Sequence, residues 1–228
     1  NIIQQATQPT ATNLRDYILL GLAVHSDNVN VELVNNLPSV TVDTSAQTHD
    51  LMRAFGFFSL DGNIVTANGA NLMFNKSFGH AFKEGANFHT NNKDPHTVSL
   101  AATVATTFRY RNQNSVEGGD ITLLDPTTYD LAGVTTTVPV NSNATIQRIY
   151  IFPSGGIRVQ RGQTVYANLS AAIDAIGKET FTTESNIEQN GLLIASIAMK
   201  KVTTELNDEA DAHIFIASRF GELGSVGS

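Results

Sequence analysis

The chain has 228 residues, 41% of them hydrophobic, so it is long and apolar enough to bury a sizeable core and is not a disordered tail. Its formal net charge of -7 and its 14 scattered lysines and arginines disfavour nucleic acid and anionic membranes as partners, because both demand a basic surface. The absence of cysteine excludes disulfides, thiolate catalysis and cysteine-ligated zinc.

The first predicted elements are strands. Tyr17–Val24 is a continuous apolar run, which favours a strand covered on both faces, and it is too short to span a bilayer. Val29, Val31 and Leu33 recur at every second position, which is the period of a half-buried strand.

A short amphipathic helix is predicted next, over Ser45–Phe55. Thr44 and Gln47 have the spacing of a capping box, in which side chains satisfy free backbone N–H groups. Leu51, Phe55 and Phe58 follow at helical spacing, and Gly56 can supply the left-handed residue that ends a helix.

The most regular pattern in the chain is the alternation over Val98–Tyr110. It predicts one long strand with Val98, Leu100, Val104 and Phe108 facing inward. The preceding residues, 59–96, contain many turn formers, and four phenylalanines are expected to supply their buried mass: Phe74, Phe78, Phe82 and Phe88.

The rest of the chain is predicted to form strands, among them one hairpin, and one helix. The hairpin is formed by Ile146–Phe152 and Ile157–Gln160 around the loop Pro153–Gly156. The helix is capped by Asn168 and closed by Gly177. The other predicted strands are Ile121–Leu124, Val134–Val140, Leu192–Met199 and His213–Ala217.

Together these elements predict a mostly β fold of antiparallel sheets, sandwich-like or jelly-roll-like, with two short helices. A polar stretch around residues 141–145 suggests a domain boundary. We expect a β-rich domain over residues 1–142, a compact hairpin, helix and strand domain over 143–222, and a flexible Gly/Ser connector over 223–228.

The segment Ile146–Tyr166 (IQRIYIFPSGGIRVQRGQTVY) resembles a stretch found in phage tail-fibre and other virion structural proteins. The similarity continues through Leu169–Ile173, Asn186–Leu193, Leu206–Asp208 and Phe220–Gly221, and more loosely through Asp50–Leu51, Phe78–Gly79 and Asp94–Pro95. The resemblance implies an appendage part of a phage virion, commonly a homotrimer, and brings no catalytic motif.

Three groups of side chains have the chemistry of a site, and each also has a structural explanation. The groups are the histidines His80, His89 and His96, the cluster Asp208, Glu209, Asp211 and His213, and the carboxylates Glu117, Asp120, Asp125 and Asp130. The first two groups match no metal-binding spacing. The third has the residue type of a glycosidase pair but lies among turn formers.

Two shorter motifs are equally ambiguous. Ser154-Gly-Gly156 lacks the pattern around a catalytic serine. Arg109, Tyr110 and Arg111 can bind a sugar or a carboxylate, or simply form the solvated end of a strand.

The sequence therefore predicts a non-enzymatic, self-associating structural component of a phage virion, with no catalytic residues, metal or cofactor and with its binding residues unassigned. Its expected partners are copies of itself, as a trimer, and other virion proteins. The alternatives are a receptor-binding tip that recognises a bacterial surface glycan, and a glycan depolymerase.

Overall fold

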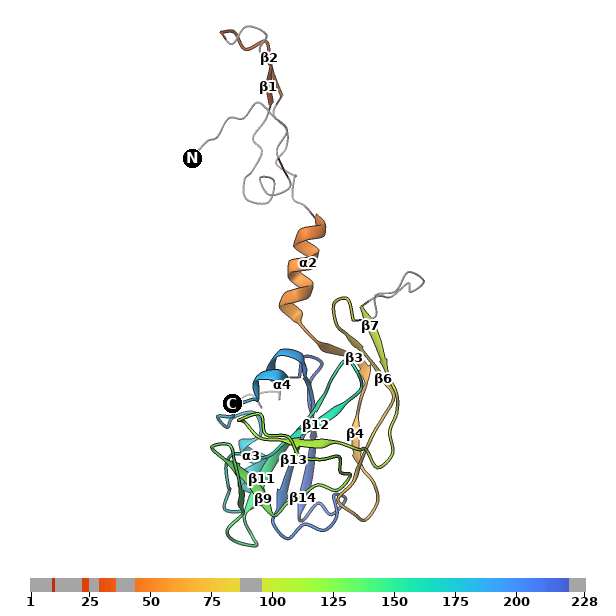
Figure 1. Ribbon diagram of the computed structural model, residues 1–228, viewed down its shortest axis with the longest axis vertical. Coiled ribbons are helices and arrows are strands. Elements are labelled where there is room, and N and C mark those ends of the chain that lie inside the picture. Colours follow the sequence, from red (N-terminus) through yellow and green to blue (C-terminus); the bar gives the residue numbers. More distant parts are fainter. Residues whose placement is uncertain (1–9, 11–21, 25–28, 36–43, 87–95, 222–228) are drawn as a thin grey trace. The chain divides into compact units, whose positions relative to one another are not determined.

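The computed structural model describes residue 10 and residues 22–24, 29–35, 44–86 and 96–221 (Figure 1). The chain divides into two compact units, Asn1–Ala54 and Phe55–Ser228. Strand accounts for 37% of the structure and helix for 13%, which confirms the predicted mostly β class with antiparallel sheets. Within the described part of the chain, no helix is long and apolar enough to cross a membrane.

The first unit contains a small hairpin. Its strands β1 (Leu22–Val24) and β2 (Leu33–Asn35) are antiparallel, with Val24 opposite Leu33. Of the half-buried strand expected over residues 29–34, only Leu33 and Val34 lie in a strand, β2. Its predicted burial is wrong, since the side chains of Val29, Val31 and Leu33 are exposed. Residues 17–21 of the expected buried strand lie outside the described residues.

The predicted helix is confirmed as α2 (Thr44–Phe55). Gly56 follows it with a φ of 66°, which is the left-handed conformation that ends a helix. Leu51 and Phe55, four residues apart, share one side of the helix and are both exposed.

The second unit is built on a five-stranded sheet in the order β14-β13-β11-β12-β8. All neighbours in it are antiparallel except β8 and β12, which are parallel. Its strands are β8 (Arg109–Arg111), β11 (Ala144–Ile151), β12 (Ile157–Gln160), β13 (Leu192–Lys200) and β14 (Ala212–Ile216).

Smaller sheets complete the second unit. One has the order β3-β6-β7, and β4 pairs with β5 and β9 with β10. Their strands are β3 (Phe58–Gly62), β4 (Val65–Ala67), β5 (Phe74–Lys76), β6 (Gly79–Phe82), β7 (Thr97–Leu100), β9 (Thr128–Leu131) and β10 (Val134–Thr137). The β9–β10 hairpin turns through Ala132 and Gly133, both with positive φ, as a tight two-residue turn requires.

The main core lies between the five-stranded sheet and the smaller sheets. The large sheet contributes one face of its strands, including Ile149, Val159 and Ile197. The smaller sheets contribute Phe74 and Leu100, together with Phe108 just before β8. The second unit is therefore a two-layer β structure whose layers share one hydrophobic core.

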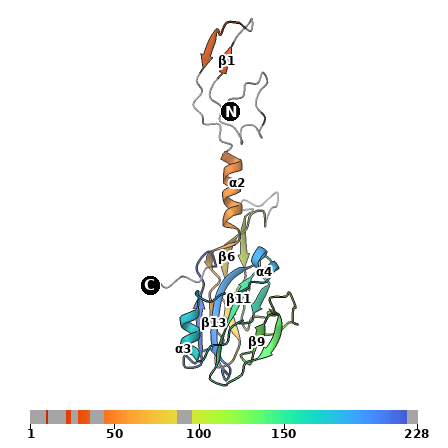
Figure 2. The same cartoon turned by 90° about the vertical axis from the view of Figure 1, so that its left-hand side faces the viewer.

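The opposite face of the large sheet is covered by two short helices. Figure 2 shows α3 (Leu169–Ala175) and α4 (Ser185–Asn190) flanking β11 and β13. The helix α3 packs Leu169 and Ala172 on the sheet, and Asn168 caps it by accepting from the N–H of Ala171, as predicted. The helix α4 packs Ile187 on the sheet and was not predicted.

The long strand predicted over Val98–Tyr110 is wrong. The chain forms β7 up to Leu100, continues irregularly, and becomes β8 only at Arg109. Ala105 has a φ of 47°, which no strand tolerates. Leu100 and Phe108 are buried as predicted, but Val104 is 79% exposed.

The hairpin formed by β11 and β12 is confirmed, with Ile151 opposite Ile157 across the predicted loop. The predicted strands near residues 192–199 and 213–217 correspond to β13 and β14. The expected strand over residues 134–140 shortens to β10, and the one over 121–124 is absent from the described elements. Phe74 is buried but Phe78 is half-exposed, and Phe88 lies outside the described residues.

The contacts divide the chain between Ala54 and Phe55, whereas the sequence suggested a boundary near residue 142. Residue 142 lies inside the second unit, because β8, from before it, is a strand of the same sheet as β11–β14. The predicted connector over residues 223–228 lies outside the described residues.

Candidate functional site

The helix-covered face of the large sheet carries a row of polar side chains across its middle. The row consists of cross-strand neighbours on four adjacent strands: Arg111, Gln160, Arg148 and Ser196. The segment between α3 and α4 covers it. The Glu179 carboxylate lies 2.7 Å from the Arg148 guanidinium, and Phe181 stacks 3.6 Å from it. Pairing compensates the buried charge of Arg148.

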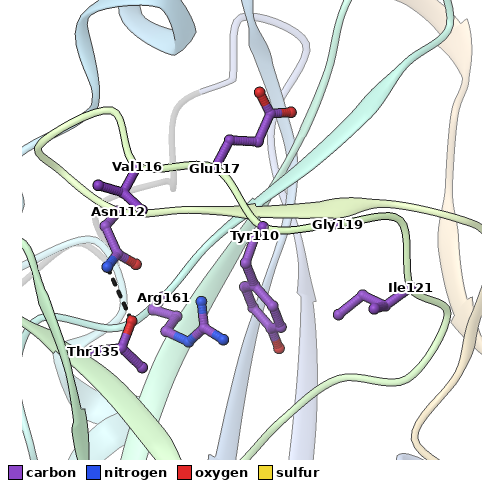
Figure 3. Close-up of a pocket in the computed structure, with 9 residues that line it drawn as sticks. Tyr110, Asn112, Val116, Glu117, Gly119, Ile121, Thr135 and Arg161 are labelled. Carbon is purple, nitrogen blue, oxygen red and sulfur yellow. Dashed lines mark hydrogen bonds between the residues drawn. The ribbon is translucent and has the colours of Figure 1, made fainter.

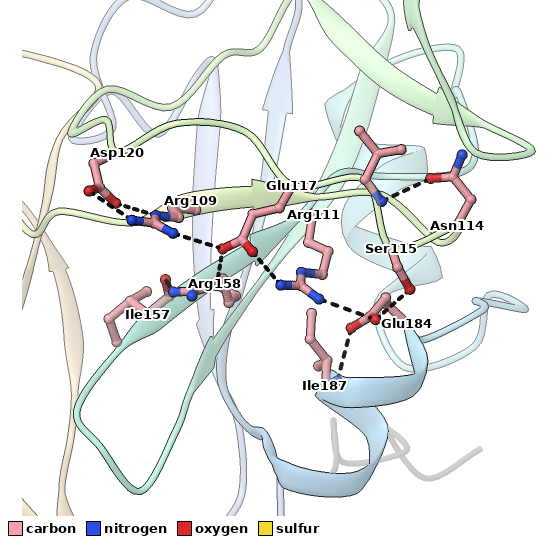
Figure 4. Close-up of polar contacts among 11 residues, drawn as sticks. Arg109, Arg111, Asn114, Ser115, Glu117, Asp120, Ile157, Arg158, Glu184 and Ile187 are labelled. Atoms are coloured by element: carbon pink, nitrogen blue, oxygen red, sulfur yellow. Dashed lines mark hydrogen bonds and ion pairs between the residues drawn. The ribbon is translucent and has the colours of Figure 1, made fainter.

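A cluster of ion pairs lies beside this row, where β8 and β12 meet. Figure 4 shows Glu117 among Arg109, Arg111 and Arg158, with its carboxylate 2.7 Å from the Arg158 Nε. Asp120 accepts from two nitrogens of Arg109, and this pairing holds the pKa of Asp120 below its usual range. The cluster binds the segment 116–121 to the edge of the sheet.

Glu184 joins α4 to the loop that follows β8. It is the N-cap of the helix, and its carboxylate accepts from the N–H of Ile187 at 3.0 Å. The same carboxylate accepts from the Ser115 hydroxyl at 2.7 Å and from Arg111 at 3.3 Å (Figure 4). Glu184 is buried, so each of these partners is needed to compensate its charge.

A pocket of about 310 Å³ opens next to this cluster. Figure 3 shows Arg161, one of its lining residues, between the ring of Tyr110 and the hydrogen-bonded pair Asn112 and Thr135. The segment 116–121 forms another wall by running antiparallel along β8, where Gly118 donates to the Tyr110 carbonyl at 2.9 Å. The Arg161 guanidinium stacks on the Tyr110 ring at 3.7 Å from its centroid.

The hydroxyl of Tyr110 points away from solvent into a buried polar group. It donates to the Gln147 Oε1 and accepts from the N–H of Asp125, both at 2.7 Å. Burial raises the pKa of Tyr110 well above its usual range. The hydroxyl therefore stays protonated and serves to join β8, β11 and the segment near Asp125.

The four carboxylates considered as a glycosidase pair all serve as local structural groups. Glu117 and Asp120 belong to the ion-pair cluster. Asp125 accepts from the hydroxyls of the two threonines that follow the adjacent proline. Asp130 accepts from the backbone N–H groups of Gln113 and Gly133 at 2.7 and 2.6 Å.

The pKa values of Asp120 and Asp125 also disfavour a glycosidase acid. A glycosidase acid requires a raised pKa. Burial acts to raise the pKa of Asp125, but hydrogen bonds from the neighbouring threonines outweigh it and lower the pKa. The pKa of Asp120 is also lowered.

The histidines considered for a metal site take separate partners. His80 binds Asp61, with its Nδ1 2.9 Å from the carboxylate. His96 accepts from the N–H of Gly85 at 2.9 Å and lies against Phe82. His89 lies outside the described residues.

The acidic cluster near the C-terminus is a turn with one ion pair. Asp208 accepts from the N–H of Ala210 at 2.9 Å, and Asp211 pairs with Lys200 at 2.8 Å. Glu209 and His213 are exposed. In the residues that the structure describes, no group of three or more histidines and carboxylates is arranged to hold a metal ion.

The Ser154 hydroxyl accepts from the N–H of Gly156 within its turn, at 3.4 Å. The Arg109-Tyr110-Arg111 segment is not a solvated strand end, since its arginines enter the ion-pair cluster and its tyrosine is buried. Sequence reasoning missed Arg161, Asn112 and Thr135, which reach the pocket from three separate segments.

Searches for similar proteins give no further guide to this arrangement. No family model, no curated protein and no solved structure matches the chain.

Proposed function

We propose that the chain is a non-enzymatic structural module of a phage virion appendage, such as a tail fibre, and that its copies associate through α2. The observation that carries self-association is the exposed apolar side of this helix, where Leu51 is 56% and Phe55 is 50% exposed. A helix of 12 residues is marginal in water without packing. A second copy that presents the same side covers both helices at once.

An aromatic cluster in the second unit, which begins at Phe55, offers further apolar surface for self-association. Phe55 stacks on Phe220 with ring centroids 5.8 Å apart, and Phe58 stacks on Phe82 at 5.0 Å. Phe220 is itself 50% exposed. Contact with a second copy would remove these half-exposed rings from water, which is the main gain in forming a subunit interface.

The charge content also favours contact between identical copies. Only 15% of the residues are charged, so few charged side chains would be buried without a partner when two surfaces meet. Closed rotational symmetry limits such assembly, and the tail-fibre resemblance points to a trimer. The structural roles taken by Glu117, Asp120, Asp125 and Asp130 support a non-enzymatic function.

Sedimentation equilibrium over a wide concentration range tests the proposal. We expect the full chain to form a closed oligomer, with three copies as the predicted order. The double variant Leu51→Ser, Phe55→Ser should shift to monomer, because both apolar contacts are lost. Val104→Ser removes an even more exposed apolar group elsewhere and should leave the oligomer intact. A full chain that stays monomeric at every concentration contradicts the proposal.

Placement on a virion has its own test. Gold-labelled antibody against the chain should decorate the tail or another appendage of the phage particle in electron micrographs. Label on the capsid shell alone, or on no part of the particle, would contradict this part of the proposal.

A further inference from the structure

The pocket beside β8 contains a positively charged side chain whose hydrogen-bond donors are not all used. Arg161 follows β12, and its Nε donates to the Thr128 hydroxyl at 3.0 Å. Among the described residues, neither terminal nitrogen of its guanidinium has a hydrogen bond, and the nearest carboxylate, that of Asp125, is 4.0 Å away. The side chain is only 14% exposed, so water replaces these bonds poorly.

The stacking on Tyr110 fixes the orientation of this guanidinium. Tyr110 is buried and held by its own hydrogen bonds, so its ring is a rigid support. Figure 3 shows the terminal nitrogens of Arg161 in the space between Tyr110 and Asn112. A planar guanidinium held in this way presents two parallel donors, the geometry that matches a carboxylate.

Other groups around the pocket add hydrogen-bonding and apolar contacts. Thr135 accepts from the Asn112 Nδ2 at 3.0 Å, which leaves its own hydroxyl hydrogen free to donate. The Asn112 Oδ1 has no partner among the described residues. Val116 and Ile121, which are 57% and 38% exposed, supply apolar surface. The Glu117 carboxylate is already paired with arginines and offers no free negative charge.

These features define the complementary ligand. It carries a carboxylate that pairs with Arg161 and hydroxyls that form hydrogen bonds with Thr135 and its neighbours. Its C–H groups pack on Val116 and Ile121. A volume of about 310 Å³ suits one sugar ring. We propose that this pocket binds a hexuronic acid, either free or as one unit of an acidic saccharide, with its carboxylate on the guanidinium of Arg161.

An acidic peptide fits the surroundings less well. Extended peptides commonly bind by adding a strand to an open sheet edge. Here the outer edge of β8 is already occupied, since Phe108 and Ile121 exchange two backbone hydrogen bonds of 2.8 and 2.9 Å. The lining residues named above all belong to one chain, and the proposal does not rest on the proposed self-association.

Titration of the isotope-labelled full chain with D-glucuronate, observed by NMR, tests the site. We expect saturable binding, with chemical-shift changes centred on Asn112, Thr135, Arg161 and the segment 116–121. D-glucose has the same ring without the carboxylate and should bind at least ~10-fold more weakly, since it lacks the charge-assisted pair. No saturable binding of glucuronate, equal binding of glucose, or shifts centred elsewhere would overturn the proposal.

Two further ligands separate the possible sources of the carboxylate. Acetate should bind more weakly than glucuronate, because it reaches only Arg161. N-acetylglutamate amide, which represents an acidic peptide side chain, should also bind more weakly than glucuronate. If either one binds as tightly as glucuronate, the saccharide assignment is wrong.

Matched variants assign the contact. Arg161→Gln should weaken glucuronate binding at least ~10-fold, while the same change at the exposed Arg219 should have no effect. Since Arg161 also packs on Tyr110, Thr135→Val gives a second test at an exposed position. It should weaken glucuronate binding several-fold and lower the melting temperature only slightly, because the Asn112 Nδ2 keeps its bond to the Gly133 carbonyl. Unchanged affinity in folded Arg161→Gln would overturn the proposal.

Discussion

The buried hydroxyl of Tyr110 shows how much of this fold depends on single polar atoms. It bonds to both Gln147 and the backbone of Asp125, and the Gln147 Nε2 returns to the Asp125 carbonyl at 2.6 Å. Gln147 is fully buried in β11. Three segments far apart in the sequence are thus joined by a closed set of hydrogen bonds, each of which leaves a buried group unsatisfied if it is broken.

Tyr110→Phe should therefore destabilise the protein by about 1–3 kcal/mol, because the Gln147 Oε1 and the Asp125 N–H would both lose their partner. Urea denaturation at neutral pH measures the loss. Tyr129→Phe is the matched control, since no hydrogen bond of the Tyr129 hydroxyl is found among the described residues, and it should change stability by less than ~0.5 kcal/mol. Equal losses for the two variants would contradict the assigned role.

Glu184 should make stability depend on pH on the acid side. Burial acts to raise its pKa, but the hydrogen bonds from Ser115 and from backbone N–H groups, together with Arg111, outweigh burial and lower it. A carboxyl whose pKa is lower in the folded state stabilises the fold above its unfolded pKa. This contribution is lost as the pH falls through the folded value.

We expect the free energy of unfolding of the full chain to be steady above about pH 5 and to fall below about pH 4, near and under the ordinary pKa of glutamate. Glu184→Gln should be less stable at pH 7 and should lose less on acidification. Urea denaturation at a series of pH values measures both. A variant that shows the full acid slope of the unaltered chain would show that Glu184 does not contribute to it.

These residue-scale features could not be predicted from the sequence. Arg148 and Gln147 stand inside an apolar run that correctly predicted a strand, but nothing local indicates that both are buried. Their partners, Glu179 and Tyr110, lie 31 and 37 positions away. The same holds for the pocket, because Arg161 acquires its role only where the strands place it beside Tyr110.

At the scale of elements, prediction succeeded where the signal is local. The cap at Asn168, the left-handed Gly56 and the loop between β11 and β12 each depend on a few consecutive residues, and each is confirmed. It failed over residues 98–110, where regular alternation suggested one strand. The outcome there depends on distant contacts, such as those of Lys76 with Thr103, which bend the chain before Ala105.

Substitutions along this segment distinguish a broken strand from a continuous one. Leu100→Asp should cost several kcal/mol, about 3 or more, since it buries an unpaired charge. Ser99→Asp and Val104→Asp should each cost less than ~1 kcal/mol, since both positions are exposed. Thermal denaturation ranks the three variants. A severe loss for Val104→Asp would favour the continuous strand and contradict the structure.

At the scale of the whole molecule, the predicted strands and helices were enough to predict a mostly β fold, but the sequence did not indicate the division into two units. A polar stretch near residue 142 looks like a linker, yet it is only the connection into β11. The contribution of β8 to the C-terminal sheet is a parallel pairing over a separation of 49 residues, from Arg109 to Arg158, which no local pattern indicates.

Fragments test this division. Residues 55–228 should fold alone and melt cooperatively, because all the sheets of the second unit are retained. Residues 143–228 should fail to fold, since they lack β8 and the smaller sheets that cover Ile149 and Val159. Calorimetry and circular dichroism measure both. A stable, cooperative 143–228 fragment would restore the boundary near residue 142.

The parallel pairing of β8 with β12 also predicts the order in which parts of the sheet fold. During synthesis β8 leaves the ribosome well before its neighbour exists, whereas β11 and β12 can close their hairpin at once. We therefore expect the hairpin to gain protection first and β8 to dock late, in a slow phase set by closing the long loop. The amide of Phe152 donates to the Gly156 carbonyl across the hairpin at 2.9 Å. Pulse-labelling hydrogen exchange during refolding should show this amide protected before that of Arg111, and simultaneous protection would contradict this order.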